Sequence, residues 1–238
     1  MLRRPIFCVP RSDAVRRAAQ YLSGIGLPVT DRAAPDISHL LLPVPSFSFG
    51  TGYLAHLLTD IPDDIVISGG FLDSPLLQGY RTVDFLKDPY YLAENAAITA
   101  SCAVTMLKAH KRHSLNDIRV LVIGWGRIGK CLGKLLQEKG AYVTIAARKD
   151  SDLAMIDALG YGAMDLNHLK PDSQFIVNTI PAMVLPRVPA NVYAIELASK
   201  PGMGGENVIV AKGLPGKMRP AESGRLIAET FMRLSEVE

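Results

Sequence analysis

The sequence has little of what a disulfide-bonded or membrane-spanning protein needs. It contains three cysteines, Cys8, Cys102 and Cys131, and no CxxC pair. An odd, scattered set of cysteines is typical of reduced thiols in a cytoplasm. No apolar run is long enough to span a bilayer, and the run Ile6–Val9 lies between prolines and is too short for the core of a signal peptide. We therefore expect a cytoplasmic protein with no membrane partner.

Charge and histidine are also sparse. The net charge of +3 is too small to indicate a nucleic-acid partner. The five histidines, at positions 39, 56, 110, 113 and 168, are scattered without an acidic residue at ligand spacing, so we expect no metal site. The glycine-containing stretch 46–52 lacks the Lys-Ser/Thr ending of a P-loop. What remains, 48% hydrophobic and 21% charged residues, is typical of a folded globular protein.

The chain divides into two segments of different texture. Residues 1–95 are rich in proline and glycine and predict a small α/β domain, with a parallel or mixed sheet, that binds substrate or a partner. Its expected strands are Ile6–Val9, His39–Leu42 and Ile65–Ser68, and its expected helices are Ala14–Leu22 and Tyr53–Leu58. A long helix, Tyr90–His110, leads into a second domain over residues 96–219. Residues 220–238, which begin with a proline at the first helical position, are expected to form a helix that packs back on the first domain.

Strands and helices alternate regularly after Arg119. The expected strands are Val120–Ile123, Tyr142–Ala147, Ala163–Met164, Phe175–Asn178, Val192–Leu197 and Val208–Ala211. One helix is expected over Ile128–Lys139, and the next starts with Asp150 or Ser151 as its cap and ends at Gly160. Six strands in a βαβ progression predict the doubly wound parallel sheet of a Rossmann domain.

The strongest motif is Gly124-Trp125-Gly126-Arg127-Ile128-Gly129, a GxGxxG pattern. The pattern alone is weak, but here it directly follows an apolar strand and opens an amphipathic helix. Gly124 would make the tight turn, Gly126 would admit the diphosphate, and Gly129 would bring helix and strand together. We therefore expect residues 124–129 to bind a dinucleotide at the helix N-terminus.

The end of the second strand indicates which dinucleotide. An NAD enzyme usually has an acidic residue there, about 20 residues past the glycines, to bind the ribose hydroxyl. This chain has Arg148 and Lys149, which would attract the 2′-phosphate of NADP. NADP is the expected cofactor. NAD stays possible because Asp150 is close enough in sequence to reach the ribose, although helix capping is the other use for it.

The loops after the later strands carry further candidates. Asn178, Thr179, Ile180 and Pro181, with Ala198, are expected to border the cofactor, because ligands bind at the carboxyl ends of parallel strands. Lys200, Lys217 and Arg219 are the candidates for binding an acidic substrate. The alternative is that each is a solvated surface cation.

In combination these motifs resemble the A subunit of dipicolinate synthase from endospore-forming bacteria. The matching segments are the glycine motif and residues 147–149, 178–182, 197–202 and 213–217, and the resemblance covers about residues 60–235. Glu94-Asn95-Ala96 resembles the family's crossing helix. The resemblance implies a Rossmann domain beside a smaller N-terminal domain, as in formate/glycerate dehydrogenases, although the N-terminal segment is short for the family.

The resemblance also implies a reaction in sporulation. A dihydrodipicolinate-type ring would be oxidised to pyridine-2,6-dicarboxylate with NAD(P), alongside a flavoprotein-like B subunit. The candidates for handling the proton are Ser199, Lys200 and Glu94. Two-domain relatives of this shape commonly form homodimers. A catalytically silent NADP sensor is the alternative, and a 2-hydroxyacid dehydrogenase is a third, weaker one, since no His–carboxylate pair or substrate arginine is evident.

Overall fold

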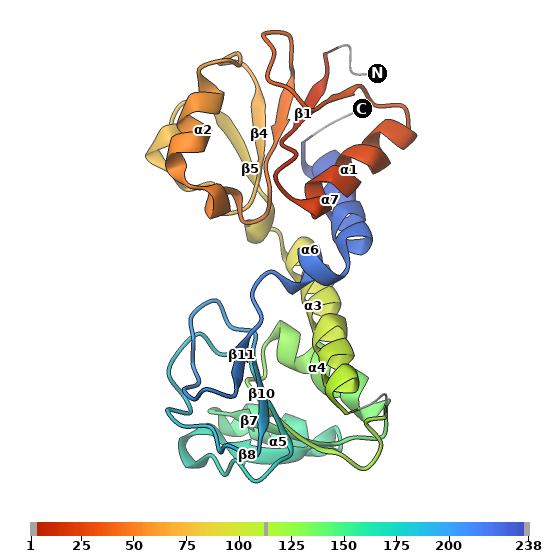
Figure 1. Ribbon diagram of the computed structural model, residues 1–238, viewed down its shortest axis with the longest axis vertical. Helices are drawn as coiled ribbons and strands as arrows, with labels where there is room; N and C mark the ends of the chain where they lie inside the picture. The colour runs from red at the N-terminus through yellow and green to blue at the C-terminus, as the bar shows by residue number, and fades with distance from the viewer. Residues whose placement is uncertain (1–3, 112–113, 236–238) are drawn as a thin grey trace. The chain divides into compact units, whose positions relative to one another are not determined.

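A computed structural model describes residues 4–111 and 114–235, apart from the side chains of residues 48 and 49. The chain divides into two compact units, residues 1–95 with 215–238, and residues 96–214. Each unit contains one parallel sheet with helices, which confirms the predicted α/β fold class (Figure 1). Helix α3, Pro89–His110, begins in the first unit and continues in the second. In the described part of the chain, no helix is long and apolar enough to cross a membrane.

The first unit has a five-stranded parallel sheet in the order β2-β1-β3-β4-β5. Its strands are β1 Ile6–Cys8, β2 Val29–Thr30, β3 His39–Leu41, β4 Val66–Gly69 and β5 Arg81–Asp84. The sequence predicted β1, β3 and β4. It missed β2 and β5, which lie at the two edges of the sheet, because they are short and only partly buried and so lack a strong apolar pattern.

Helices cover both faces of this sheet. On one face α2, Thr51–Leu58, contributes Leu54 and Leu57 to an apolar core that includes Phe7 and Leu40. On the other face lie α1, Asp13–Gly24, and α7, Pro220–Leu234, which run side by side (Figure 1). Three short 3-10 helices, Ser46–Phe49, Pro75–Leu77 and Phe85–Lys87, complete the unit.

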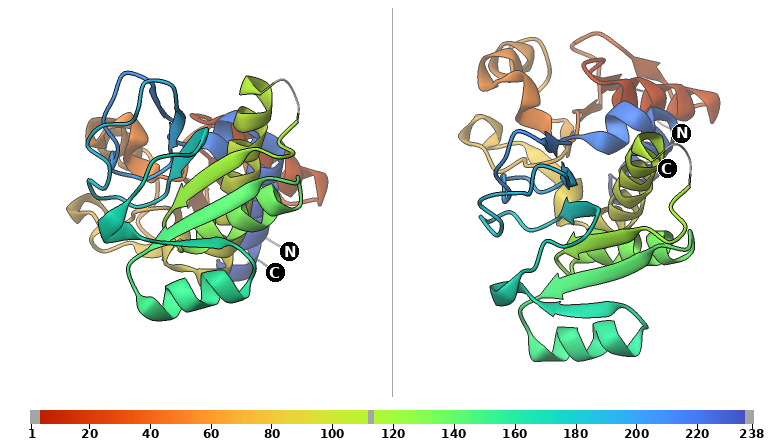
Figure 2. Two further views of the ribbon diagram at one scale, coloured as in Figure 1. Left: turned by 90° about the horizontal axis from the view of Figure 1, so that it is seen from below. Right: turned by 60° about the horizontal axis from the view of Figure 1, so that its bottom comes forward.

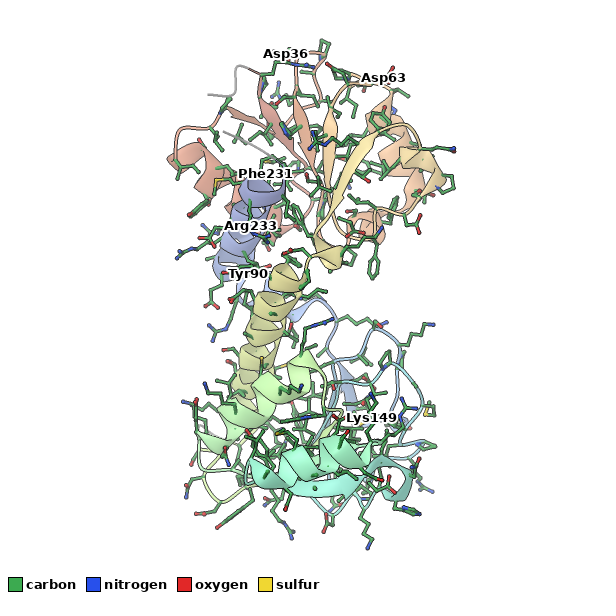
Figure 3. The ribbon with its side chains drawn as sticks, turned by 180° about the vertical axis from the view of Figure 1, so that it is seen from behind. Asp36, Asp63, Tyr90, Lys149, Phe231 and Arg233 are labelled. Carbon is green, nitrogen blue, oxygen red and sulfur yellow. The ribbon has the colours of Figure 1, made fainter. Side chains whose placement is uncertain are left out.

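The C-terminal helix is tied to this unit by close contacts. A Cβ at Gly224 would lie 2.6 Å from the Ala14 carbonyl oxygen, so α7 approaches the backbone of α1. The ring of Phe231 meets His39 edge to face at 5.4 Å. Arg233, labelled in Figure 3, pairs with Asp88, the residue before α3.

The second unit has a six-stranded, all-parallel sheet in the order β11-β10-β9-β6-β7-β8. Its strands are β6 Arg119–Ile123, β7 Tyr142–Ala147, β8 Gly162–Asp165, β9 Phe175–Asn178, β10 Tyr193–Glu196 and β11 Val208–Val210. This is the Rossmann order, and the strand sequence reverses between β6 and β9. The predicted doubly wound sheet is confirmed.

The two faces of this sheet are covered differently. Val120 and Val122 point into a core formed with α3, α4 (Arg127–Gln137) and α5 (Asp150–Ala158). Leu121 and Ile123 point to the opposite face, which is covered by the long connections around β10. Figure 2 shows α5 lying along the strands at the β8 edge.

Two local predictions are wrong. The N-cap of α5 is Lys149, and Asp150 is the first helical residue, so neither Asp150 nor Ser151 caps the helix. The loop expected before the last helix contains a short helix, α6, over Leu214–Met218. The boundary between the two compact units lies after Leu214, and residues 215–219 are part of the first unit. A last short 3-10 helix, Leu166–His168, follows β8.

Candidate functional site

The glycine motif forms a sharp bend between β6 and α4. Gly124 has φ +112°, a backbone conformation that favours glycine, and its N–H donates to the carbonyl of Ala146 on β7 at 2.9 Å. A Cβ on Gly124 would lie 2.4 Å from Thr179 Oγ1. The hydroxyl of Thr179 in turn donates to the Ile123 carbonyl at 2.9 Å. The first turn of the motif is therefore closed against the loop after β9.

The other two glycines differ in what surrounds them. A Cβ on Gly129 would lie 2.0 Å from the Gly124 carbonyl oxygen, so this glycine lets α4 approach the bend. At Gly126, the N-cap of α4, φ is −81°, and beyond its chain neighbours no residue that the structure describes has an atom within 4 Å of an added Cβ. No described side chain caps this helix. The first N–H groups of α4 thus remain available, together with the positive end of the helix dipole, which suits a diphosphate.

The remaining motif residues have separate places. Arg127 is exposed and Ile128 is half-buried at the start of α4. The ring of Trp125 packs edge to face on Tyr161 at 5.9 Å, and Lys130 Nζ lies over the same ring at 5.4 Å. Burial, with a smaller effect of Glu138, raises the pKa of Tyr161. Trp125 is therefore part of the packing within the second unit.

Two cations follow β7. Arg148 and Lys149 are exposed, and Figure 3 shows Lys149 beside the start of α5. Over residues 4–111 and 114–235, neither has an ion-pair partner. Asp150 lies in the first turn of α5, where its charge complements the helix dipole. The end of β7 therefore carries two free positive charges where the ribose of a dinucleotide would lie.

The loop after β9 is held by the buried side chain of Asn178. Its amide nitrogen donates to the carbonyl of Ile180 at 2.9 Å and to Glu196 Oε1 and Oε2 at 2.9 and 3.0 Å. Its amide oxygen accepts from the Ile180 N–H at 3.0 Å. Because both polar atoms are used inside the protein, Asn178 shapes the loop. Thr179 and Ile180 are the residues of this loop that lie against Gly124.

Glu196, at the end of β10, is a residue that our sequence reasoning missed. It is fully buried, and no other acidic residue of the described chain is buried. Besides Asn178, it accepts hydrogen bonds from the backbone N–H groups of Ala198, Gly202 and Met203 at 3.0, 2.8 and 3.1 Å. The available signal was an acidic residue inside an apolar strand, which burial makes costly unless it is hydrogen-bonded.

The remaining expected site residues, for cofactor, substrate and catalysis, fall in both units. Ser199 and Lys200 are exposed in the loop after β10, and Pro181 is exposed after β9. Ala198 is buried, with its N–H used by Glu196.

The other expected residues belong to the first unit. Glu94 is exposed on α3, and Lys217 is exposed on α6. Arg219, just before α7, is paired with Glu222 at 2.6 Å. Lys200, Lys217 and Arg219 therefore do not all lie in one unit, and their joint role stays a prediction.

The histidines add one correction. His168 does have an acidic neighbour, because its Nδ1 lies 2.7 Å from Asp165 Oδ2 just after β8. Among the residues that the structure places, no group of three or more His, Cys, Asp or Glu side chains could hold a metal ion. His113 lies outside the described residues.

Comparison with known proteins agrees with this geometry. Residues 95–185 match the family model of the NAD binding domain of D-isomer specific 2-hydroxyacid dehydrogenases. A comparison with curated protein sequences found no match. Among solved structures, the chain is similar to the A subunit of dipicolinate synthase from Bacillus halodurans, with 21% identity, 97% of both chains covered and a TM-score of 0.80. It is also similar to the corresponding dipicolinate synthase polypeptide from Bacillus subtilis, with 19% identity, 99% of this chain and 97% of that chain covered, and a TM-score of 0.80.

A third similar structure is a transhydrogenase from Sinorhizobium meliloti, with 14% identity, 91% of this chain and 79% of that chain covered, and a TM-score of 0.70. At these identities the likeness shows the fold alone. One expectation is corrected: since 97% of both dipicolinate synthase chains is covered, the N-terminal segment is not short beside them.

Proposed function

We propose that this chain is an oxidoreductase that binds a nicotinamide dinucleotide and prefers NADP to NAD. The observation that carries the proposal is the bend at Gly124–Gly129, which leaves the N-terminus of α4 open to a diphosphate. The match of residues 95–185 to an NAD binding domain supports it. Arg148 and Lys149 support NADP, since an exposed cation attracts the 2′-phosphate.

We further propose that the substrate is a dihydrodipicolinate-type dicarboxylate, which is oxidised to dipicolinate. The motif resemblance and the structural likeness to the A subunit of dipicolinate synthase support this choice. The bound nicotinamide would accept the hydride that the ring loses, and one proton leaves with it. Because aromatisation supplies much of the driving force, the chain has mainly to orient the ring and take up the proton.

Specific residues are available for both tasks. Lys200 in the second unit and Lys217 in the first are exposed cations, and each suits a carboxylate; Arg219 suits one less because Glu222 already pairs with it. Ser199, Lys200 and Glu94 are the candidates for accepting the proton. A 2-hydroxyacid dehydrogenase activity is less well supported, because the one described His–carboxylate pair follows β8, on the side of the sheet where the adenosine half would lie.

We also propose that the chain forms a homodimer, works in the cytoplasm and acts with a B subunit like that of dipicolinate synthase. Light scattering of the purified chain would test the dimer. Co-purification of the two co-expressed subunits would test the partner, and a chain that elutes alone would contradict it.

The function itself is tested in two steps. Titration calorimetry should show NADP binding more tightly than NAD, and failure to bind either nucleotide would contradict the proposal. Freshly generated dihydrodipicolinate is then added with NADP, with and without the B subunit, and the absorbance of the reduced nicotinamide is followed. Reduction in either mixture supports the proposed reaction. Binding without reduction in both mixtures would indicate a cofactor-sensing protein instead.

A further inference from the structure

Glu196 is a buried carboxylate that is stabilised without a cation. No basic residue of the described chain forms an ion pair with it, and the groups that donate to it are neutral N–H groups. Burying a charge is costly unless hydrogen bonds replace its hydration. Both carboxylate oxygens of Glu196 therefore need hydrogen-bond donors from the surrounding loops. The same hydrogen bonds hold those loops in place.

These donors come from two loops at the carboxyl ends of neighbouring strands, β9 and β10. Asn178 ends β9, while Ala198, Gly202 and Met203 follow β10. The loops also touch directly at Gly202, where a Cβ would lie 2.4 Å from the Ala182 carbonyl oxygen and 2.5 Å from Asn178 Nδ2. Glu196 therefore sets the position of both loops at the carboxyl ends of β9 and β10.

The Rossmann order indicates which part of a dinucleotide would lie over these loops. The diphosphate would lie at the bend after β6, and Arg148 at the end of β7 would meet the adenosine half. The nicotinamide half must then extend to the other side of the switch point, over β9 and β10. This step rests on the proposed function.

We propose that Glu196 is a positioning residue for the nicotinamide half of the cofactor site. The two carboxylate oxygens of Glu196 accept hydrogen bonds and do not donate them. This suits a position where the hydrogen-bonding neighbours are all N–H donors. A glutamine at this position would turn an NH₂ group toward N–H donors whichever way its amide is oriented. The loop after β10 would then move away, while the loop after β9, which Thr179 ties to the Ile123 carbonyl, keeps its place together with the bend at Gly124 and the cations after β7.

The test compares two ligands on four proteins. Calorimetry measures NADP and adenosine 2′,5′-bisphosphate, which carries the adenosine half alone, on wild type, Glu196→Gln, Gly202→Ala and Glu206→Gln. The last is a matched control, since Glu206 is exposed on the same connection. Gly202→Ala displaces the same loops without changing the carboxylate, and so keeps the test informative if Glu196→Gln fails to fold.

We expect Glu196→Gln and Gly202→Ala to weaken NADP binding by about tenfold or more, since a buried polar group loses its partners. Binding of the bisphosphate should change less than about twofold in either. Glu206→Gln should match wild type with both ligands.

An equal loss of affinity for NADP and for the bisphosphate would overturn the positioning role of Glu196, while the proposal that the chain binds a dinucleotide would stand. Unchanged NADP affinity in both Glu196→Gln and Gly202→Ala would also overturn the positioning role alone. Wild-type protein that binds neither ligand would overturn both this inference and the proposed function.

Discussion

Substitution of Gly126 by alanine should weaken cofactor binding while leaving the stability of the fold nearly unchanged. Apart from its two chain neighbours, no described residue has an atom within 4 Å of the Cβ that alanine would add, and φ is −81°, which alanine adopts freely. Alanine is a poorer N-cap than glycine, at a cost below about 1 kcal/mol, and loses less backbone entropy on folding, a gain of about 0.4–1 kcal/mol. These effects nearly cancel, so Tm should move by no more than about 2–4 °C.

The expected effect on binding is much larger. In the proposed site, the diphosphate approaches the backbone at Gly126, so the added methyl occupies its place. Loss of two charge-assisted hydrogen bonds at about 1.5–3 kcal/mol each predicts that Kd for NADP rises by at least about a hundredfold. Thermal unfolding and calorimetry on the same preparation measure the two quantities. Gly24→Ala is the control, because Gly24 also has open space and lies in the other unit.

Unchanged NADP affinity in Gly126→Ala would refute the placement of the diphosphate on this bend. A large fall in Tm would refute the reasoning from another side, because it would mean that the fold itself requires the glycine.

Three further predictions concern charge, pH and packing. Arg148→Ala should weaken NADP binding by about tenfold and leave NAD binding unchanged, as measured by calorimetry, whereas Arg119→Ala, at the opposite end of the strands, should change neither. Burial lowers the pKa of His39 below its ordinary 6.5. The unfolded chain therefore binds a proton at His39 more readily than the folded chain does. The contribution of neutral His39 to the free energy of unfolding should be fully present above pH 6.5 and decrease as the pH drops below it. His39→Phe should reduce that dependence in pH-scanned thermal unfolding. Gly224→Ala should destabilise the first unit by about 1–3 kcal/mol in urea unfolding, since its Cβ would meet the α1 backbone, and an unchanged midpoint would contradict the packing.

The second unit was largely predictable because its signals are local. The apolar strand before Gly124 and the spacing of the glycines identify a β-turn-α unit without any knowledge of distant residues. Arg148 could likewise be placed at the end of β7, since the strand that precedes it is continuously apolar over its last three residues. In the first unit, β5 was missed, because an edge strand with exposed residues has no such pattern.

The candidate site shows the same limit. Thr179 was expected to border a cofactor, but its contact with Gly124 depends on how closely the loop after β9 approaches the bend, which no local pattern in the sequence shows. Glu196 was missed because a glutamate in a strand is usually a surface residue. Only the folded chain brings it four separate N–H donors.

The sequence by itself therefore determined the class of the second unit and the place of its glycine bend, because both follow from local patterns: the alternation of apolar strands with helices, and the spacing of the glycines. The tertiary structure decided which loops surround that bend and made Glu196 their common anchor. Such contacts depend on which strands become neighbours, and this is set when the whole sheet packs its two faces.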